Sequence, residues 1–201
     1  MDHLRRLEEI FARFPGIGPR QARRFVYHII NKSPASVKEF TDLINEVRKA
    51  AHECVDCHRY FFKNHQKTDA CSICHDQSRD RSTLLIVAHD SDLESIEKSG
   101  AYQGRYFVLG GLVPILDKEP EKRIRLKTLL ERVSEINSDL KEIILSLNTT
   151  PDGEHTARIV REALEAICST RVTVLGRGLS TGSELEYVDG ETIRNALGNR
   201  K

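Results

Sequence analysis

Apolar residues recur three and four positions apart in the first part of the chain, a spacing that places them on one face of a helix. The first such stretch contains Leu4, Leu7, Ile10, Phe11 and Phe14. The run Pro-Gly-Ile-Gly at 15–18 breaks this pattern, and Pro19 suits the first position of a second helix. The pattern resumes at Ala22, Phe25, Val26 and Ile29, and later at Val37, Phe40, Leu43, Ile44 and Val47. The sequence therefore predicts two helices around a tight turn, followed by a third amphipathic helix.

Short apolar runs alternate with helical stretches from residue 83 onward. Strands are expected at 84–88, 105–109, 142–147 and 171–175, and helices at 92–99, 121–137 and 153–169. This alternation is typical of a mostly parallel sheet covered by helices, so we expect an α/β fold with several modules. The last of these helices should turn inward a face made of Ala157, Val160, Ala163, Leu164 and Ile167, with Cys168 in the same core. From 176 onward the chain is rich in glycine and then briefly helical.

Length and charge limit the possible functions. The 201 residues can form one large domain or two to three small modules. A net charge of +1 excludes a uniformly basic nucleic-acid binder, so any DNA contact needs a local basic patch. No apolar run approaches the roughly 20 residues of a membrane span, and the first residues do not resemble a signal peptide. We expect a cytoplasmic, nucleoid-associated protein, in which disulfides are rare.

Four of the five cysteines form two pairs with metal-ligand spacing. Cys54 and Cys57 are separated by two residues, as are Cys71 and Cys74, and thirteen residues lie between the pairs. Each such turn can place two thiolates on one side of a zinc ion. Four protein ligands leave no open position for water, so the predicted zinc is structural. The alternative is four unligated buried thiols, which the polar surroundings disfavour; His58, His65 and His75 are weaker candidate ligands.

Residues 14–20 resemble a helix-hairpin-helix element. Glycines in such a turn let the backbone approach a phosphate, and the following helix directs free N–H groups and its positive dipole end toward it. Residues 1–32 carry seven Lys/Arg and three Asp/Glu, a local charge of +4. The predicted DNA-binding residues are Gly16, Ile17, Gly18, Arg20, Arg23 and Arg24. Phosphate contacts give affinity without sequence choice; the alternative is a basic hairpin used for self-association.

These motifs, in this order, resemble the RecR family of bacterial recombination mediators. The resemblance rests on residues 14–20, the two cysteine pairs, and residues 104–111, 148–157 and 177–187. It implies four modules along the chain. They are a helix-hairpin-helix DNA-binding region with its following helix at 1–53, a four-cysteine zinc finger at 54–76, a Toprim domain at 82–176, and a C-terminal segment at 177–201 that packs on the Toprim domain or on a neighbouring subunit.

The resemblance also identifies candidate acidic residues. Toprim enzymes such as topoisomerases and primases place acidic residues around magnesium, and the corresponding pair here is Asp152 and Glu154. The proton-transferring glutamate at the end of the first strand is replaced by Ala88, which can neither move a proton nor bind a cation. His89 and Asp90 follow one and two residues later and could partly substitute, but a step of one residue along a strand reverses the direction of the side chain. We therefore predict no catalytic residue, and Asp152 and Glu154 remain candidates for magnesium binding, partner docking or a helix N-cap.

The function implied by the resemblance is that of a DNA-repair scaffold. It would be a homo-oligomer, a dimer or a tetrameric ring around DNA, that acts with RecO and RecF to help RecA load at single-strand gaps. Two alternatives stay open. One is a magnesium-dependent Toprim nuclease or primase-like enzyme using Asp90, Asp152 and Glu154. The other is an oligomerising protein-interaction module that never touches DNA. No GxxxxGK[ST] motif is present, so no nucleotide site is predicted.

Overall fold

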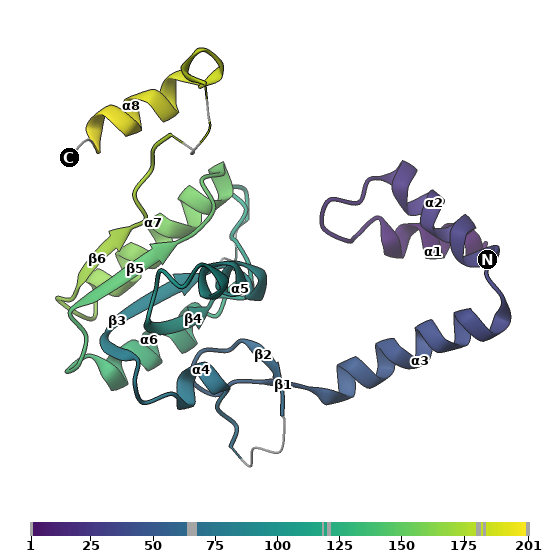
Figure 1. Ribbon diagram of the computed structural model, residues 1–201, viewed down its shortest axis with the longest axis horizontal. Helices are drawn as coiled ribbons and strands as arrows, with labels where there is room; N and C mark the ends of the chain where they lie inside the picture. The colour runs from purple at the N-terminus through teal and green to yellow at the C-terminus, as the bar shows by residue number, and fades with distance from the viewer. Residues whose placement is uncertain are drawn as a thin grey trace. The chain divides into compact units, whose positions relative to one another are not determined.

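A computed structural model describes residues 2–63, 68–117, 119, 122–179, 182 and 184–199. The chain divides into two compact units, Met1–Ala51 and His52–Lys201. Figure 1 shows both units. None of the helices in these ranges is both long enough and apolar enough to span a membrane.

The first unit consists of the three predicted helices, α1 (His3–Phe11), α2 (Pro19–Ile30) and α3 (Pro34–Ala50). The side chains of Asp2 and Ser33 cap α1 and α3 by accepting backbone N–H groups. The ring of Phe11 packs edge-on against Phe14 and Phe25, with centroids 5.6 and 5.8 Å apart. The apolar face of α3, made of Phe40, Leu43, Ile44 and Val47, is exposed. The predicted periodicity is therefore correct, but this face is not covered within the unit.

The second unit begins with a small module around the cysteines. It contains β1 (Ala51–Glu53) and β2 (Tyr60–Phe62), which form a two-stranded sheet, and the short helix α4 (Ser72–His75). The sequence pattern did not predict these strands, because three residues are too few to establish a period of two.

A four-stranded parallel sheet forms the core of the second unit (Figure 1). Its strands are β3 (Asp80–Val87), β4 (Gly104–Val108), β5 (Glu142–Ser146) and β6 (Arg171–Val174), in the spatial order β4-β3-β5-β6. All three neighbouring pairs are parallel. The helices α5 (Asp90–Ser99), α6 (Leu126–Ile136) and α7 (Pro151–Glu165) connect them, so the predicted α/β class is confirmed.

Alternate residues of the strands face two different layers. Leu84, Ile86, Phe107, Ile143 and Leu145 pack with buried residues of α6 and α7. On the opposite face, Leu85, Val87, Tyr106 and Val108 pack with Leu93 of α5 and with the buried cysteines. Since both faces are covered, the strands are nearly continuous apolar runs, as expected for a parallel sheet. The cysteine module is thus part of the packing of the sheet.

The structure corrects several predicted boundaries. Helix α6 begins at Leu126 rather than 121, because Arg125 has ψ 49° and its N–H donates to Leu109 O at 2.9 Å; residue 121 itself lies outside the described residues. Helix α7 begins at Pro151 and ends at Glu165, so Ile167, 43% exposed, is not on its inward face. Cys168 follows the helix and is half-buried against the core. The predicted final helix is α8 (Gly190–Gly198), preceded by the 3-10 turn η2 (Leu185–Tyr187).

Candidate metal centre and nucleic-acid interface

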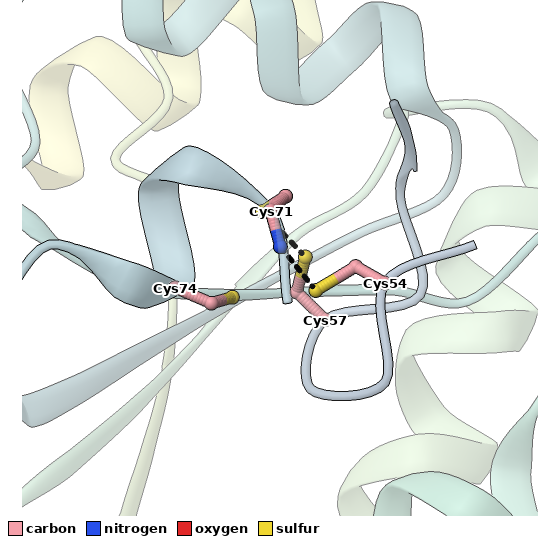
Figure 2. Close-up of side chains that lie close together, drawn as sticks. All are labelled: Cys54, Cys57, Cys71 and Cys74. Atoms are coloured by element: carbon pink, nitrogen blue, oxygen red, sulfur yellow. Dashed lines mark hydrogen bonds between the residues drawn. The ribbon is translucent and has the colours of Figure 1, made fainter. Parts of the chain in front are cut away.

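Four cysteine side chains from two separate turns meet at one point. The Sγ atoms of Cys54, Cys57, Cys71 and Cys74 lie within 4.8 Å of one another, and Figure 2 shows the side chains gathered together. The Sγ atoms of Cys57 and Cys71 are 3.7 Å apart. Four thiolates bound tetrahedrally at about 2.3 Å from a zinc ion would be separated by roughly 3.8 Å. The cluster can therefore hold a metal ion, and its spacing fits zinc.

His58 and His75 do not join this cluster. Within the described ranges, the four cysteines are the only group of three or more His, Cys, Asp or Glu side chains that could hold a metal. His58 instead approaches Glu53, with Nδ1 and Oε1 2.8 Å apart. His65, a weaker candidate ligand from the sequence, lies outside the described residues.

Both cysteine turns are closed by the same kind of backbone bond. The N–H of His58 donates to Cys54 O at 3.0 Å, and the N–H of His75 donates to Cys71 O at 2.9 Å. The N–H of Cys71 also donates to Sγ of Cys54 at 3.2 Å. A sulfur that accepts an N–H bond is stabilised as a thiolate, which is the form that binds a metal.

The crowded sulfurs titrate against one another. Hydrogen bonds from Cys57, Cys71 and Cys74 hold the pKa of Cys54 well below its ordinary value. The bond to Cys54 raises the pKa of Cys57 above its ordinary value, and burial adds to that effect. Without a cation the four thiols therefore cannot all ionise near neutral pH. A divalent ion would remove this restriction, because it stabilises every thiolate at once.

Backbone and ionic contacts join the cysteine module to the end of the sheet. The N–H of Tyr60 donates to Oδ1 of Asp90 at 2.7 Å, and the N–H of Val108 donates to Cys57 O at 2.8 Å. Glu53 forms an ion pair with Arg125 at 3.1 Å, and Arg125 Nη1 donates to Val108 O at 3.2 Å. The module thus bonds directly to residues at the carboxyl ends of β3 and β4.

In the first unit, the turn between α1 and α2 has a backbone that requires glycine at one position. Gly16 has φ +74°, a conformation that glycine adopts far more readily than a residue with a Cβ. Gly18 is the N-cap of α2, and a Cβ there would meet no atom within 4 Å. Glycine at this position leaves the approach to the helix end open. Ile17 is half-buried, and its N–H donates to Phe14 O at 3.0 Å.

The start of α2 combines free backbone donors with arginines. The first helical bond runs from Ala22 N to Gly18 O, so the N–H groups of Arg20 and Gln21 have no partner inside the helix. Arg24 donates to the amide oxygen of Gln21 at 3.2 Å. Neither Arg20 nor Arg24 has a carboxylate within 4.0 Å among the residues placed here, whereas Arg23 pairs with Glu8 at 3.0 Å. That pair raises the pKa of Arg23 and braces the two helices.

Asp90, Asp152 and Glu154, the three acidic residues considered for magnesium binding, each form a hydrogen bond or ion pair within the protein. Asp90 accepts the N–H of Tyr60, and Asp152 accepts the N–H of Ile115 at 3.1 Å. Glu154 forms an ion pair with Arg177. Asp152 and Glu154 both lie in the first turn of α7, and the N-cap of this helix is Thr150. The structure does not bring the three carboxylates together as a metal-ligand group.

Comparisons with known proteins decide the family. Proteins named Recombination protein RecR match nearly the whole chain. The one from Cereibacter sphaeroides strain ATCC 17029 is 39% identical over 198 residues, which cover 98% of this chain and 96% of the relative. The one from Ruegeria pomeroyi is 38% identical and that from Methylobacterium radiotolerans 37%, covering 97% and 98% of this chain and 94% of each relative. The chain belongs to the RecR family.

Two family models also match parts of this RecR-family chain. The model described as the Toprim domain matches residues 82–176, and the model described as RecR, C-terminal, matches residues 178–201. The Toprim match covers all of β4, β5 and β6 and most of β3. Ala88, fully buried, directly follows β3, where the resemblance places the Toprim glutamate.

Sequence reasoning missed several residues of this RecR-family site. Glu53 and Arg125 bridge the cysteine module to the sheet, and Tyr60 does so through its backbone. A backbone N–H carries no residue-specific signal, so nothing in the sequence identified Tyr60. Glu53 directly precedes Cys54, and this position was the only indication that it contributes to the module.

Proposed function

We propose that the chain is a non-enzymatic, DNA-binding recombination mediator that acts in recombinational DNA repair. The observation that carries this proposal is membership of the RecR family over nearly the full length of the chain. By family resemblance, its partners are RecO and RecF, with which it helps RecA load at single-strand gaps. A protein with this role works in the cytoplasm, at the nucleoid.

The DNA contact is assigned to the hairpin between α1 and α2. Gly16 shapes the turn, Gly18 opens the helix end, and Ile17 anchors the turn. Arg20 and Arg24 supply guanidinium groups that are not neutralised by a carboxylate within the described residues. Arg23, the third arginine assigned to the contact, is paired with Glu8 and mainly holds α1 against α2. Phosphate contacts of this kind bind DNA irrespective of its sequence.

Zinc is the metal proposed for the cysteine cluster. Four thiolates with tetrahedral spacing are the donor set that structural zinc prefers. The ion would hold the two turns together, and Cys57 O and Tyr60 N connect those turns to β4 and α5. Its role is to complete the packing of the module, because four protein ligands leave no position for a substrate.

The absence of catalysis is supported by what the acidic residues do. Asp90, Asp152 and Glu154 hold the cysteine module, the loop at Ile115 and Arg177. The position of the proton-transferring glutamate is occupied by Ala88. These contacts favour a structural use of the acidic pair over magnesium binding. They argue against the nuclease or primase-like alternative.

A homo-oligomer, either a dimer or a tetrameric ring, is proposed from apolar surfaces in both units. In the first unit, α3 exposes Phe40, Leu43, Ile44 and Val47 on one face. In the second unit, the C-terminal segment exposes Leu185, Tyr187 and Leu197, and neither η2 nor α8 has a buried residue. Clusters of exposed apolar side chains favour association with another protein surface. Several hairpins in one assembly would also raise the time spent on DNA.

A gel-shift titration on gapped DNA tests this function, with zinc-loaded protein and with or without RecO. The expected result is binding without strand cleavage or synthesis when magnesium or manganese is added. Cleavage or synthesis that Asp152→Asn abolishes would establish the enzymatic alternative instead. Failure of the assembled, zinc-loaded protein to bind DNA would favour the pure interaction module.

A further inference from the structure

A second basic groove lies in the unit that contains the sheet. It has a volume of about 480 Å³ and runs between α7, the end of β6 and α8. Arg158, Arg161 and Arg177 line it together with the amides of Asn195 and Asn199, and Glu154 is its one acidic residue. The lining therefore carries three positive charges and one negative charge, a local excess of two positive charges.

Two of these arginines lack a neutralising partner. Arg158 donates from Nη2 to Nδ1 of His155 at 3.0 Å, and Arg161 donates from Nη1 to the carbonyl of Val172 at 3.0 Å. Neither has a carboxylate within 4.0 Å in the described part of the chain. By contrast, Arg79, Arg123 and Arg132 of the same unit each have a carboxylate within 2.7 Å. Arg158 and Arg161 therefore bring two unneutralised positive charges to the groove.

The arginines of the groove are also fixed in position. Arg158 and Arg161 are three residues apart on α7 and so lie on the same side of the helix. The hydrogen bonds to His155 and Val172 orient their side chains but leave other guanidinium N–H groups free. Arg177 is held by Glu154, and the amide of Asn199 donates to Arg177 O at 2.7 Å. An arriving anion would therefore meet donors that need little reordering.

We propose that this groove binds phosphodiester groups of DNA, as a second contact separate from the hairpin. Guanidinium groups match the geometry of phosphate oxygens, and amide N–H groups add neutral donors. An acidic peptide could instead add a strand to the outer edge of β6. Arg161 already occupies the carbonyl of Val172, however, so that edge is partly blocked. The choice of DNA as the source of phosphate rests on the proposed function.

The test compares full-length, zinc-loaded variants by fluorescence anisotropy over a range of salt concentrations. The groove variant is Arg158→Gln/Arg161→Gln, which removes both positive charges and keeps polar side chains at these positions. The matched control, Lys98→Gln/Lys127→Gln, removes the same charge from exposed positions outside the groove. The hairpin variant is Arg20→Ala/Arg24→Ala. Each is titrated with a labelled single strand and a labelled duplex of equal length.

The groove variant should lose two phosphate contacts. On its preferred DNA form, the slope of log affinity against log salt should then fall by about 1.4 for a single strand or about 1.8 for a duplex. The control should retain the wild-type slope. Groove and control variants that both match the wild type would overturn the inference. The proposed function would survive that result if the hairpin variant still lost affinity.

Other outcomes are equally decisive. If the groove variant binds DNA more weakly and the hairpin variant binds it normally, the groove assignment would stand and the hairpin assignment would be refuted. A groove variant that binds DNA normally but loses a peptide rich in Asp and Glu would show that the ligand is an acidic protein segment, and would refute the phosphodiester assignment. No DNA binding by the wild type would refute both the groove and the proposed function.

Discussion

The backbone N–H of Tyr60 donates a 2.7 Å hydrogen bond to the carboxylate of Asp90. Tyr60 begins β2 of the cysteine module, and Asp90 begins α5, two residues beyond Ala88. Asp90, the acidic residue nearest in sequence to the position of the missing Toprim glutamate, therefore accepts a hydrogen bond from the cysteine module. This contact joins the cysteine module to the region just after β3, where the resemblance places the Toprim glutamate.

Removing this carboxylate should loosen the module. We expect Asp90→Ala to lower the free energy of unfolding by about 1–2 kcal/mol, because a charged acceptor and its hydrogen bond are lost. Urea denaturation of the zinc-loaded protein measures this change. The control is Glu131→Ala, whose carboxylate lies 3.9 Å from the exposed Lys127 and should contribute less than about 0.5 kcal/mol. Equal effects of the two substitutions would contradict the role of Asp90.

Metal binding should release protons and strengthen as pH rises. In the metal-free cluster the pKa of Cys57 is raised, so this thiol holds its proton at neutral pH. A zinc ion needs the thiolate and must displace that proton. Zinc affinity should therefore fall as pH is lowered, and calorimetry in buffers of different ionisation enthalpy should detect proton release. Cys57→Ser should lose tight one-to-one zinc binding, and unchanged zinc content in that variant would contradict the four-cysteine site.

The first turn of α7 should tolerate no side chain at Gly153. A Cβ at Gly153 would lie 1.9 Å from the backbone oxygen of Asn148, so the backbone must shift. We expect Gly153→Ala to lower the free energy of unfolding by about 1–3 kcal/mol. Gly176→Ala is the control, because a Cβ there meets no atom within 4 Å. Thermal unfolding of both variants checks this, and equal stability would show that the turn is not constrained.

Much of this architecture follows from sequence periodicity. The spacing of Leu4, Leu7 and Ile10 is that of one helix face, and the apolar run that starts at residue 84 is typical of a buried strand. The cysteine spacing predicts the metal cluster because two turns of the same kind suffice to place four sulfurs. The family resemblance adds the Toprim domain and its altered first-strand position at Ala88.

Contacts between elements could not be predicted in this way. Whether Arg23 faces a phosphate or Glu8 depends on the crossing of α1 and α2, and no local pattern encodes that geometry. The start of α6 moved from 121 to Leu126 because Arg125 is tied to Leu109 across the fold. From the sequence, Asp152 and Glu154 are candidates for magnesium binding, partner docking or a helix N-cap. Their partners in the structure, Ile115 and Arg177, lie far away in the chain.

The exposed face of α3 should support self-association. Leu43 is 56% exposed, so Leu43→Asp should leave the fold of one chain intact but place a charge in an apolar interface. Light scattering after size-exclusion chromatography should then show a smaller assembly. Thr41→Asp adds the same charge away from Leu43 on the same helix and should keep the wild-type mass. A full-sized assembly of Leu43→Asp would exclude this face from the interface.

The salt dependence of DNA binding tests the central assignment most directly. Arg20 and Arg24 stand beside the free N–H groups at the start of α2 and should each neutralise a phosphate. We predict that Arg20→Ala/Arg24→Ala weakens binding equally for all sequences. The slope of log affinity against log salt should fall by about two units, roughly one for each lost contact. A double variant that binds with the wild-type affinity and slope would contradict the account.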